Sequence, residues 1–363
     1  MSIACDRHVD ERRPRRPRVA LIGLAGVTGS RLLSCAELGA RFDLSPEKIV
    51  DKTGVTGLRR LACGESLIDL ARAAGSAVLA RAGVPHRAVT AVFGSSNPTA
   101  DDLLPTFTAA AAHALGFNNL IVDHVGIGCC GGLQALRNAW NQLTVDALDG
   151  RIGYALVIAG DHTSRILEPG RRQTGTLFGE GVSVALLTND PAARTGYAID
   201  RVVTRSALGD ALYALRLRNP YAQPPGAELP RLEMDGARIF EFGAAAAAEF
   251  LALLGLPALP DGCYLVPHQP NLRMLDAMAE RAGLDAARVY VDGIRTIGNT
   301  SAPAAMLGLE DALRRGLADP TAQVLLGAFG AELQVGAALL SPIDPLALVA
   351  GPPLTRARAQ EAA

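Results

Sequence analysis

The chain has 363 residues, of which 49% are hydrophobic and 20% charged, and 35 basic residues against 36 acidic ones give a formal net charge of −1. This length and composition can bury the core of two packed halves, whereas the balanced charge and an aromatic content of 4% argue against nucleic-acid binding. No apolar run approaches the roughly eighteen residues of a transmembrane helix, and the cysteines lack metal-ligand spacing, so neither a membrane span nor a metal site is expected.

Both ends of the chain are expected to be tails. Residues 1–17 are basic and contain prolines but lack the apolar segment of a secretory signal, and we expect them to be disordered. Residues 342–363 are expected to form a flexible tail. Because neither a secretory signal nor a disulfide framework is evident, we expect a cytoplasmic protein with no membrane and no nucleic-acid partner.

Between these tails, short β-branched runs alternate with Ala- and Leu-rich segments of helical period. The predicted strands are residues 18–27, 88–94, 119–126 and 154–160 in the first half and residues 264–268, 288–293 and 323–330 in the second. Strands that are separated by helices in this way predict a layered α/β protein with buried sheets.

The two halves resemble each other in four places, in the same order. Residues 80–98 parallel 253–271, residues 109–125 parallel 275–293, Ile127-Gly128-Cys129 parallels Ile297-Gly298-Asn299, and residues 178–187 parallel 329–340. Four ordered matches favour an internal duplication over coincidence of composition. We therefore expect two halves, residues 18–190 and 191–341, whose equivalent loops meet at a pseudo-twofold centre.

A glycine-rich segment, residues 126–140, carries the adjacent pair Cys129 and Cys130 and is predicted to become helical at about Cys130. A cysteine at a helix start lies close to free backbone N–H groups and to the positive end of the helix dipole. Both favour the thiolate and are expected to lower the thiol pKa. Such a cysteine is a candidate nucleophile, and the alternative is a small buried residue that packs a helix end.

Two polar residues of the second half have comparable positions. His268 directly follows a predicted buried strand, and Asn299 is the counterpart of Cys129 in the duplication. Taken singly, His268 fits a hydrogen-bonded structural residue, and Asn299 fits a helix N-cap. If the two halves pack around a pseudo-twofold centre, the loops that carry Cys129, His268 and Asn299 converge there.

These motifs resemble those of the β-ketoacyl-acyl-carrier-protein synthase III enzymes of the thiolase superfamily, over roughly residues 18–340. The segment from Cys129 is similar to the family's Cys-Ala-Gly-Phe motif before an Ala-Leu helix. Residues 267–273 reproduce Pro-His-Gln-x-Asn-x-Arg, and residues 298–302 reproduce Gly-Asn-Thr-Ser-Ala. The resemblance implies a thiolase-like α/β fold, with two duplicated halves that form a layered αβαβα sandwich.

The resemblance also implies a reaction that needs no cofactor and no metal. Cys129 would take an acyl group from an acyl-CoA or acyl-carrier-protein thioester, with the backbone N–H groups of Cys129 and Ala331 as the oxyanion hole. His268 and Asn299 would then donate hydrogen bonds to the enolate that forms when a malonyl-type carrier-protein thioester loses carbon dioxide. Condensation of that enolate with the acyl group would give a β-ketoacyl product.

Some positions near the expected substrate depart from the family's pattern. Gly132 stands where the family usually has a large apolar residue, which suggests a roomier acyl pocket and leaves Cys130 open as the nucleophile. Lys48 stands where the family often has a tryptophan that stacks on the adenine of CoA, and Arg165 falls on the basic half of that sandwich. These departures favour a carrier-protein donor or a differently held CoA, and a role in secondary metabolism.

Expected contacts with macromolecular partners are altered as well. Arg273 is retained as a carrier-docking cation, but Glu241 and Glu280 replace expected cations and would weaken docking to an acidic carrier. Glu332 stands where the final loop normally has glycine, as a solvated carboxylate or as a group that shapes the pocket. The resemblance implies a homodimer in which the loop near Leu104 reaches the partner's acyl pocket.

Three alternative functions were weighed against condensation. One is acyl transfer to an alcohol or amine on the same scaffold, but Asn299 favours condensation because simple acyl transfer forms no enolate. Another is a non-catalytic partner subunit of a heterodimeric synthase, against which the complete set of Cys129, His268 and Asn299 argues. The third is a nucleotide loop at Gly23, Gly26 and Gly29, whose spacing does not fit the dinucleotide fingerprint.

Overall fold

The computed structural model describes residues 16–97, 102, 104–168, 170–208, 212–217 and 232–344. Most of the two expected tails, residues 1–15 and 345–363, lies outside the described residues. The last strand, β13, runs from Gln334 to Asp344, so the C-terminal tail begins later in the chain than predicted. At the other end, the Arg16 guanidinium lies 5.5 Å from the ring centre of Trp140.

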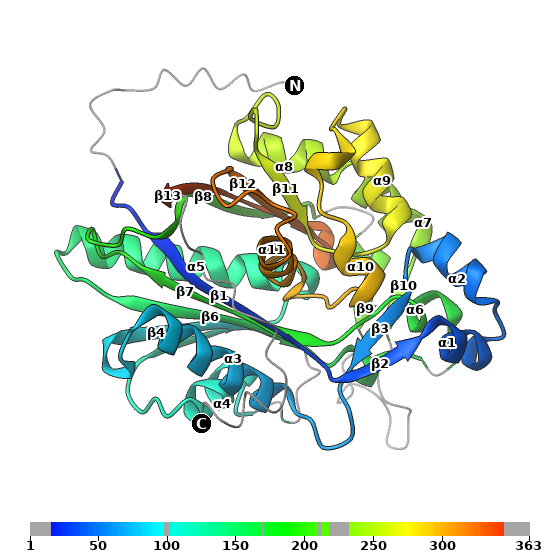
Figure 1. The fold of residues 1–363 in the computed structure, drawn as a ribbon, viewed down its shortest axis with the longest axis horizontal. Coiled ribbons are helices and arrows are strands. Elements are labelled where there is room, and N and C mark those ends of the chain that lie inside the picture. The colour runs from blue at the N-terminus through cyan, green and yellow to red at the C-terminus, as the bar shows by residue number, and fades with distance from the viewer. Residues whose placement is uncertain are drawn as a thin grey trace.

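The first half of the chain contributes five strands to a mixed sheet (Figure 1). In sheet order they are β1 (Ala20–Thr28), β7 (Gly181–Thr188), β6 (Tyr154–Asp161), β4 (Val89–Ser95) and β5 (Ile121–Val125). The pairs β1–β7 and β7–β6 are antiparallel, and β6–β4 and β4–β5 are parallel. Helices α4 (Phe107–Ala114) and α5 (Gly131–Leu148) make the crossovers that the parallel strands require.

The second half repeats this pattern of strand directions. In sheet order its strands are β8 (Gly196–Ser206), β13, β12 (Val324–Phe329) and β11 (Tyr264–Pro267). The pairs β8–β13 and β13–β12 are antiparallel, and β12–β11 is parallel. Strands β1 and β8 pair at Ala20 with Ala198 and at Leu21 with Tyr197, which joins both halves into one nine-stranded sheet within the described residues. The expected duplicated fold is therefore confirmed.

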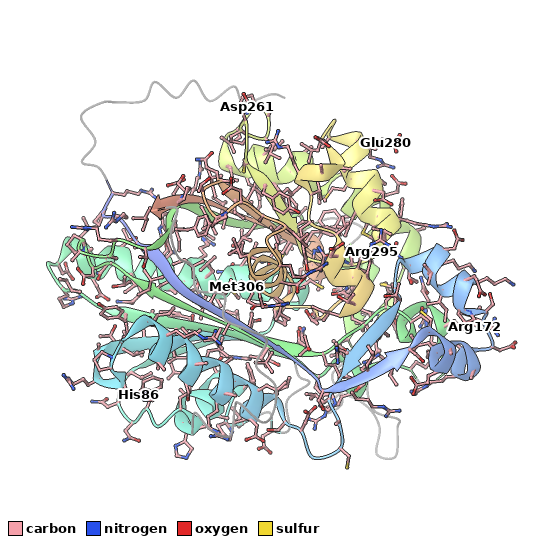
Figure 2. The ribbon with its side chains drawn as sticks, viewed as in Figure 1. His86, Arg172, Asp261, Glu280, Arg295 and Met306 are labelled. Atoms are coloured by element: carbon pink, nitrogen blue, oxygen red, sulfur yellow. The ribbon has the colours of Figure 1, made fainter. Side chains whose placement is uncertain are left out.

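The helices form three layers around the two halves of the sheet. Helices α5 and α11 (Ala304–Arg314) lie between them, and Met306 of α11 is buried in this central layer (Figures 1 and 2). Helix α3 (Leu67–Ala82) and α4 cover the outer face of the first half, while α8 (Ala246–Leu254) and α9 (Leu272–Arg281) cover that of the second. This is the predicted αβαβα sandwich.

The buried strands serve two layers at once because successive side chains point to opposite faces of a sheet. In β6, Ala155, Val157 and Ala159 pack into the central core, whereas Leu156 and Ile158 pack against α3 and α4. A strand that is covered on both faces must be apolar throughout, which explains the unbroken run that predicted it.

The fold corrects one predicted strand and agrees with the rejection of the nucleotide loop. Residues 288–293 were predicted as a strand but contribute a single parallel bridge, from Val289 to Leu265, before helix α10 (Asp292–Thr296) begins. Gly23 and Gly26 lie inside strand β1 and not at a turn into a helix, which agrees with the rejection of a nucleotide loop there. Gly26 instead allows close packing, because a Cβ there would lie 2.5 Å from the Cδ2 atom of Leu307 in α11.

Smaller elements gather beside α9, at the end of the sheet that carries the candidate site (Figure 1). They are β2 (Arg31–Ser34), α1 (Cys35–Phe42), α2 (Pro46–Thr53), β3 (Gly57–Arg60), α6 (Arg172–Gly175), β9 (Leu215–Leu217), β10 (Leu232–Met234) and α7 (Gly236–Ala244). Together with the loops after β5, β11 and β12, they enclose a cavity.

Candidate active site

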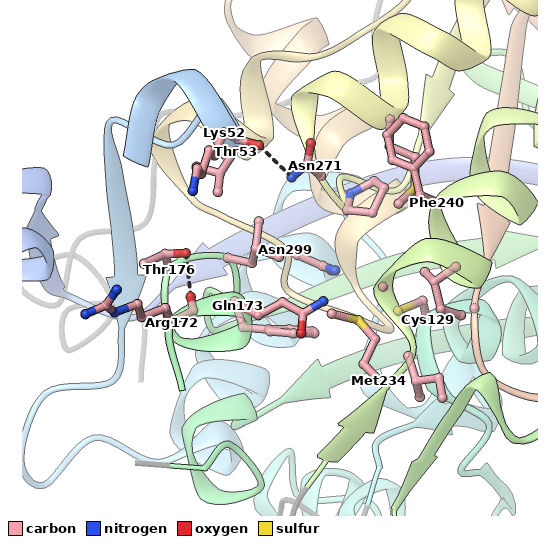
Figure 3. Close-up of a pocket in the computed structure, with 18 of the residues that line it drawn as sticks. Lys52, Thr53, Cys129, Arg172, Gln173, Thr176, Met234, Phe240, Asn271 and Asn299 are labelled. Carbon is pink, nitrogen blue, oxygen red and sulfur yellow. Dashed lines mark hydrogen bonds between the residues drawn. The ribbon is translucent and has the colours of Figure 1, made fainter. Parts of the chain in front are cut away.

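The structure brings the three predicted catalytic residues to one cavity. Cys129, His268 and Asn299 all line an internal space of about 410 Å³ that extends from α2 and α6 to the sulfur (Figure 3). We call this space the entry cavity. Cys129 comes from the first half of the chain and the other two from the second, so the site exists only where the halves meet.

Cys129 lies in a short 3-10 turn, Gly128–Cys130, that leads directly into α5. Gly128 has a φ of 69°, a left-handed conformation that glycine adopts without strain. Gly330 of the opposite half packs on the cysteine, since a Cβ there would lie 3.0 Å from the Cβ and 3.4 Å from the Sγ of Cys129. The sulfur is therefore fixed between a helix start and a side-chain-free loop.

The expectation of a lowered thiol pKa is wrong. Burial raises the pKa of Cys129 to about 11, and the charge of Asp161 acts in the same direction, while a hydrogen bond to Ser301 opposes both. The position at the start of α5 also favours the thiolate. The sequence predicted the helix start but not the burial, which both halves create together. The resting site thus holds a thiol.

Cys130 has surroundings of a different kind. Its side chain is fully buried in the central core, its Sγ lies 3.3 Å from the backbone oxygen of Gln334, and it lines neither cavity at the site. Burial raises its thiol pKa well above the ordinary value. The geometry therefore favours Cys129 over Cys130 as the residue that can reach a substrate.

His268 directly follows strand β11, and its backbone N–H donates to Gly327 at 2.8 Å. The backbone N–H of Phe329 donates to the Nδ1 atom of His268 at 3.4 Å, so the ring proton of the neutral imidazole is assigned to Nε2. Burial lowers the pKa of His268 to about 3, which keeps the ring neutral throughout the physiological range. His268 is therefore equipped to donate one hydrogen bond into the cavity.

Asn299 is held by the backbone of the first half. Its N–H donates to Leu177 at 2.8 Å, and its carbonyl oxygen accepts from Gly179 at 2.9 Å. Its side-chain Oδ1 accepts from the backbone N–H of Ser301 at 2.9 Å. That bond commits the oxygen and leaves the Nδ2 amide group as the free donor.

The loop after β12 supplies the second amide of the expected oxyanion hole. Ala331 packs on the turn that carries the nucleophile, because a Cβ at Gly128 would lie 2.8 Å from the Cβ of Ala331. Glu332 follows with a φ of 59°, a conformation that explains why a glycine would suit this position. Its exposed carboxylate lies at a second cavity.

The second cavity, of about 590 Å³, meets the entry cavity at Cys129, Phe178 and Leu215. We call it the acyl cavity. Apolar side chains that include Ile166 and Leu232 line much of it, and a polar wall carries Asn97, Asp161 and Ser301. A group attached to the sulfur can thus extend in a direction different from the path by which it arrived.

One predicted contact residue is wrong, and a second stays a prediction. Gly132 lines neither cavity: a Cβ there would lie 2.4 Å from the backbone oxygen of Ala302, so the other half fills the space expected for an acyl chain. Arg165 is exposed and lines neither cavity, so its contact with a substrate or carrier stays a prediction, whereas Arg172 of α6 lines the entry cavity (Figures 2 and 3).

The remaining predicted contacts lie at the periphery. Arg273 in α9 is exposed and forms an ion pair with Asp51 of α2 at 2.7 Å, close to the mouth of the entry cavity. Leu104 has 82% of its surface exposed and lines neither cavity of its own chain. Neither residue therefore contacts the reacting atoms within one chain.

Sequence reasoning missed the polar wall and part of the cavity mouth. Asp161 ends the buried strand β6, and Asn97 follows β4, so polar residues at the ends of adjacent parallel strands were the available signal. Lys48 and Lys52 both line the entry cavity one helical turn apart on α2, and they are the only lysines in the sequence. Residue counts by type would have drawn attention to them.

The described ranges lack two other kinds of feature. They contain no group of three histidine, cysteine, aspartate or glutamate side chains arranged to hold a metal ion. No helix among them has the length and apolar character needed to cross a membrane.

Comparison with known proteins gives a consistent result along the chain. The family model of 3-oxoacyl-[acyl-carrier-protein] synthase III matches residues 125–206, and the model of its C-terminal part matches residues 260–341. The β-ketoacyl-[acyl-carrier-protein] synthase III of Oleidesulfovibrio alaskensis is 31% identical over 332 residues, which cover 88% of this chain and 98% of that protein.

Two further relatives widen the comparison. The acetoacetyl CoA synthase NphT7 of a Streptomyces species is 31% identical over 333 residues, which cover 89% of this chain and 98% of the relative. The crystal structure of the priming β-ketosynthase from the R1128 polyketide biosynthetic pathway superposes with a TM-score of 0.80 at 28% identity, covering 92% and 99% of the two chains. With its duplicated thiolase-like fold, the chain belongs to the β-ketoacyl-[acyl-carrier-protein] synthase III family of acyl-transferring enzymes.

Proposed function

We propose that this chain transfers an acyl group from a thioester to Cys129 and condenses it with a malonyl-type thioester. The observation that carries the proposal is the arrangement of His268 and Asn299, each with one polar atom already bonded and its donor left for the cavity that contains Cys129. Two donors beside a nucleophile suit a reaction that develops negative charge on oxygen twice.

The first step forms an acyl-enzyme. The Cys129 thiol loses its proton, its thiolate attacks the donor carbonyl, and the bond from that carbon to the donor sulfur breaks. The donor sulfur leaves as a thiolate and takes up the released proton. The tetrahedral intermediate carries its charge on oxygen, where the N–H groups of Cys129 and Ala331 would stabilise it. The acyl group then extends into the acyl cavity.

The second step forms the carbon–carbon bond. Loss of carbon dioxide from the malonyl-type thioester leaves the bonding electron pair as an enolate, to which His268 and Asn299 donate hydrogen bonds. The enolate carbon attacks the acyl-Cys129 carbonyl, the carbon–sulfur bond breaks, and a β-ketoacyl product leaves. Because burial lowers the pKa of His268 to about 3, the imidazole acts as a neutral donor and not as an acid.

The variant Asn299→Ala separates the two steps. It should accept an acyl group at nearly the normal rate but release carbon dioxide about a hundredfold more slowly, because losing one oxyanion donor costs roughly 3 kcal/mol. Single-turnover acylation followed by intact mass, beside carbon dioxide release from labelled malonyl thioester, measures both. Equal slowing of both steps contradicts the proposal. Acyl transfer by the wild type without carbon dioxide release would replace it with acyl transfer to an alcohol or amine.

We further propose that the donor is recognised through the phosphate of a phosphopantetheine arm, on CoA or on a carrier protein. Lys48 and Lys52 place two ammonium groups at the mouth of the entry cavity, and neither forms an ion pair within the described residues. Position 48 offers no aromatic ring for an adenine. Arg273 contributes less, because Asp51 already neutralises it.

Donors that differ in one group test this recognition. Acyl-phosphopantetheine should acylate Cys129 about as well as acyl-CoA, and acyl-pantetheine, which has no phosphate, about tenfold less well. The double variant Lys48→Met/Lys52→Met should abolish that difference, while Arg72→Met on the distant helix α3 should preserve it. A strong preference for CoA over phosphopantetheine would show that adenine is recognised after all.

The protein is proposed to act as a homodimer in secondary metabolism. Strand β5 is an edge strand of the sheet, and its Ile121 and Val122 are 47% and 43% exposed, which suits pairing with a second copy. Leu104, which lines no cavity of its own chain, would then reach the partner's acyl cavity. The likeness to a priming ketosynthase of a polyketide pathway supports the metabolic role. Sedimentation that finds only monomers at micromolar concentration would exclude the dimer.

A further inference from the structure

A serine hydroxyl lies beside the sulfur of Cys129. The Sγ atom is 3.8 Å from the Oγ of Ser301, and the thiol donates to that oxygen. The Nδ2 group of Asn97 also donates to the Ser301 Oγ, at 3.2 Å. Both groups line the acyl cavity with Cys129. The hydroxyl oxygen of Ser301 therefore already accepts two hydrogen bonds.

The orientation of Asn97 is set by a buried carboxylate. Asp161 is fully buried, and its Oδ2 accepts from the Asn97 Nδ2 at 2.9 Å while its Oδ1 accepts from the Asn97 backbone at 2.7 Å. On the other side, the Asn97 Oδ1 accepts from the backbone N–H of Gly128 at 2.9 Å. A carboxylate only accepts and an N–H only donates, so the amide of Asn97 cannot be reversed.

The consequence is a hydroxyl proton without a partner next to the sulfur. With its oxygen accepting from Asn97 and from the thiol, the Ser301 hydroxyl has no acceptor of its own among the described residues. The backbone fixes the serine in place, because its N–H donates to Asn299 and its φ is 64°. Once Cys129 loses its proton, the thiolate becomes an acceptor for this hydroxyl, at 3.8 Å.

We propose that the Ser301 hydroxyl donates a hydrogen bond to the thiolate of Cys129, and that Asn97 and Asp161 hold that hydroxyl in the required orientation. Ser301 is then a further catalytic residue that acts whenever the sulfur is negative: before it attacks the donor and again when condensation releases it. Asn97 and Asp161 are positioning residues. The inference shares with the proposed function only the choice of Cys129 as nucleophile.

Other groups near the sulfur do not replace this hydrogen bond. Asp161, from β6, is negative and opposes the thiolate. His268, after β11, is neutral because burial lowers its pKa to about 3. Cys130, the neighbour in the turn, is a buried thiol, and Glu332, from the loop after β12, is exposed at the acyl cavity. Ser301 is thus the side chain among these that can lower the energy of the thiolate directly.

The pH dependence of alkylation at Cys129 tests the proposal without any acyl donor. Wild type, Ser301→Ala and Ser301→Gly are exposed briefly to iodoacetamide between about pH 7 and pH 11, and the Cys129 peptide is quantified by mass. Because burial raises the pKa of Cys129 to about 11, this range covers the rising limb, and loss of one hydrogen bond to a charged sulfur should displace that limb by about one pH unit to higher pH. Below the midpoint, both variants should react about tenfold more slowly.

The two substitutions separate the hydroxyl from the backbone. Glycine relieves the left-handed conformation at position 301 and alanine does not, so the two variants should differ in thermal stability but share the same displacement. A displacement that follows stability, or wild-type reactivity of both variants at every pH in the range, overturns the proposal. The control Thr300→Val removes the adjacent hydroxyl, which makes no hydrogen bond to Cys129, and should leave the curve in place.

A double variant tests the role of Asn97. Asn97→Ala should displace the curve in the same direction by less than Ser301→Ala, because the hydroxyl remains but loses its orientation. Asn97→Ala/Ser301→Ala should titrate like Ser301→Ala alone, since a positioning residue has no effect once its target is gone. If the displacements of the two single variants add in the double variant, Asn97 does not act through Ser301 and the proposal is overturned. These results do not depend on whether the enzyme condenses, so their failure is distinguishable from failure of the proposed function.

Discussion

The two equivalent turns at the centre of the molecule share a backbone conformation and continue differently. Gly128 and Gly298 both have positive φ, 69° and 91°, and each presents the next residue, Cys129 or Asn299, to the cavity. After Cys129 a helix follows almost at once, whereas after Asn299 the helix begins only at Ala304. The first turn therefore gives a sulfur at a helix start, and the second gives a loop of hydrogen-bond donors.

This difference shows how a duplicated fold acquires two chemical roles. The duplication fixes where the two residues lie, because equivalent loops meet at the pseudo-twofold axis. The delayed helix in the second half leaves Ser301 free to bond to Cys129 across that axis and to give its N–H to Asn299. The symmetry determines where the two residues lie, and the delayed helix, a local departure from that symmetry, determines which groups each turn presents.

The largest expected effect comes from removing the sulfur of the first turn. Cys129→Ala should abolish acyl-enzyme formation, because no other cysteine among the described residues lines either cavity. Cys130→Ala should retain it at a measurable level, since the Cys130 side chain packs in the core. Intact mass after incubation with an acyl thioester checks both variants. Acyl mass on the Cys129→Ala protein would place the nucleophile elsewhere.

The next largest effect, on stability, is expected from a buried ion pair beside the second turn. Arg60 forms a buried ion pair with Glu180 at 3.2 Å, and Arg59 beside it bonds to the backbone of Ile297 in that turn. Arg60→Met should lower the free energy of unfolding by about 3–5 kcal/mol, because it leaves a buried carboxylate without its cation. Urea denaturation at neutral pH measures this, and a loss below about 1 kcal/mol would contradict it.

The pH dependence of the same pair has a defined sign. Burial alone would raise the pKa of Glu180, but Arg60 and hydrogen bonds from Ser164 and Leu61 lower it below its ordinary value. The stability that the wild type gains from the lowered pKa is present above the unfolded value of about 4.3 and is lost as pH falls below it. In Arg60→Met, burial raises the pKa of Glu180 without the opposing cation. The difference in unfolding free energy between wild type and Arg60→Met should therefore narrow as the pH is lowered.

The smallest effect is expected where the helix after the first turn meets the loop after the second. Gly132→Ala should cost about 1–3 kcal/mol, because the new methyl group would overlap the backbone oxygen of Ala302. Helix propensity alone predicts the opposite sign, a gain of about 1 kcal/mol. The sign of the change in thermal denaturation therefore decides whether this contact is as tight as the structure indicates.

The sequence was sufficient for features that local pattern and order determine. Buried strands gave unbroken apolar runs, and the duplication placed Cys129 and Asn299 at equivalent turns. It failed where distant segments act on one residue: the space at Gly132 is filled by the other half, and the raised pKa of Cys129 results from burial by both halves. The sequence also did not indicate that Arg172 lines the entry cavity.

The position of the two lysines has a practical consequence. Every other basic side chain that is counted in the charge balance is an arginine, so Lys48 and Lys52 are the only side-chain amines of the 363-residue chain. Both are exposed at the mouth of the cavity that leads to Cys129. An amine-reactive dye would thus attach at this entrance and at the chain's α-amino group, and a substrate arm bound in the entry cavity should protect both lysines from it.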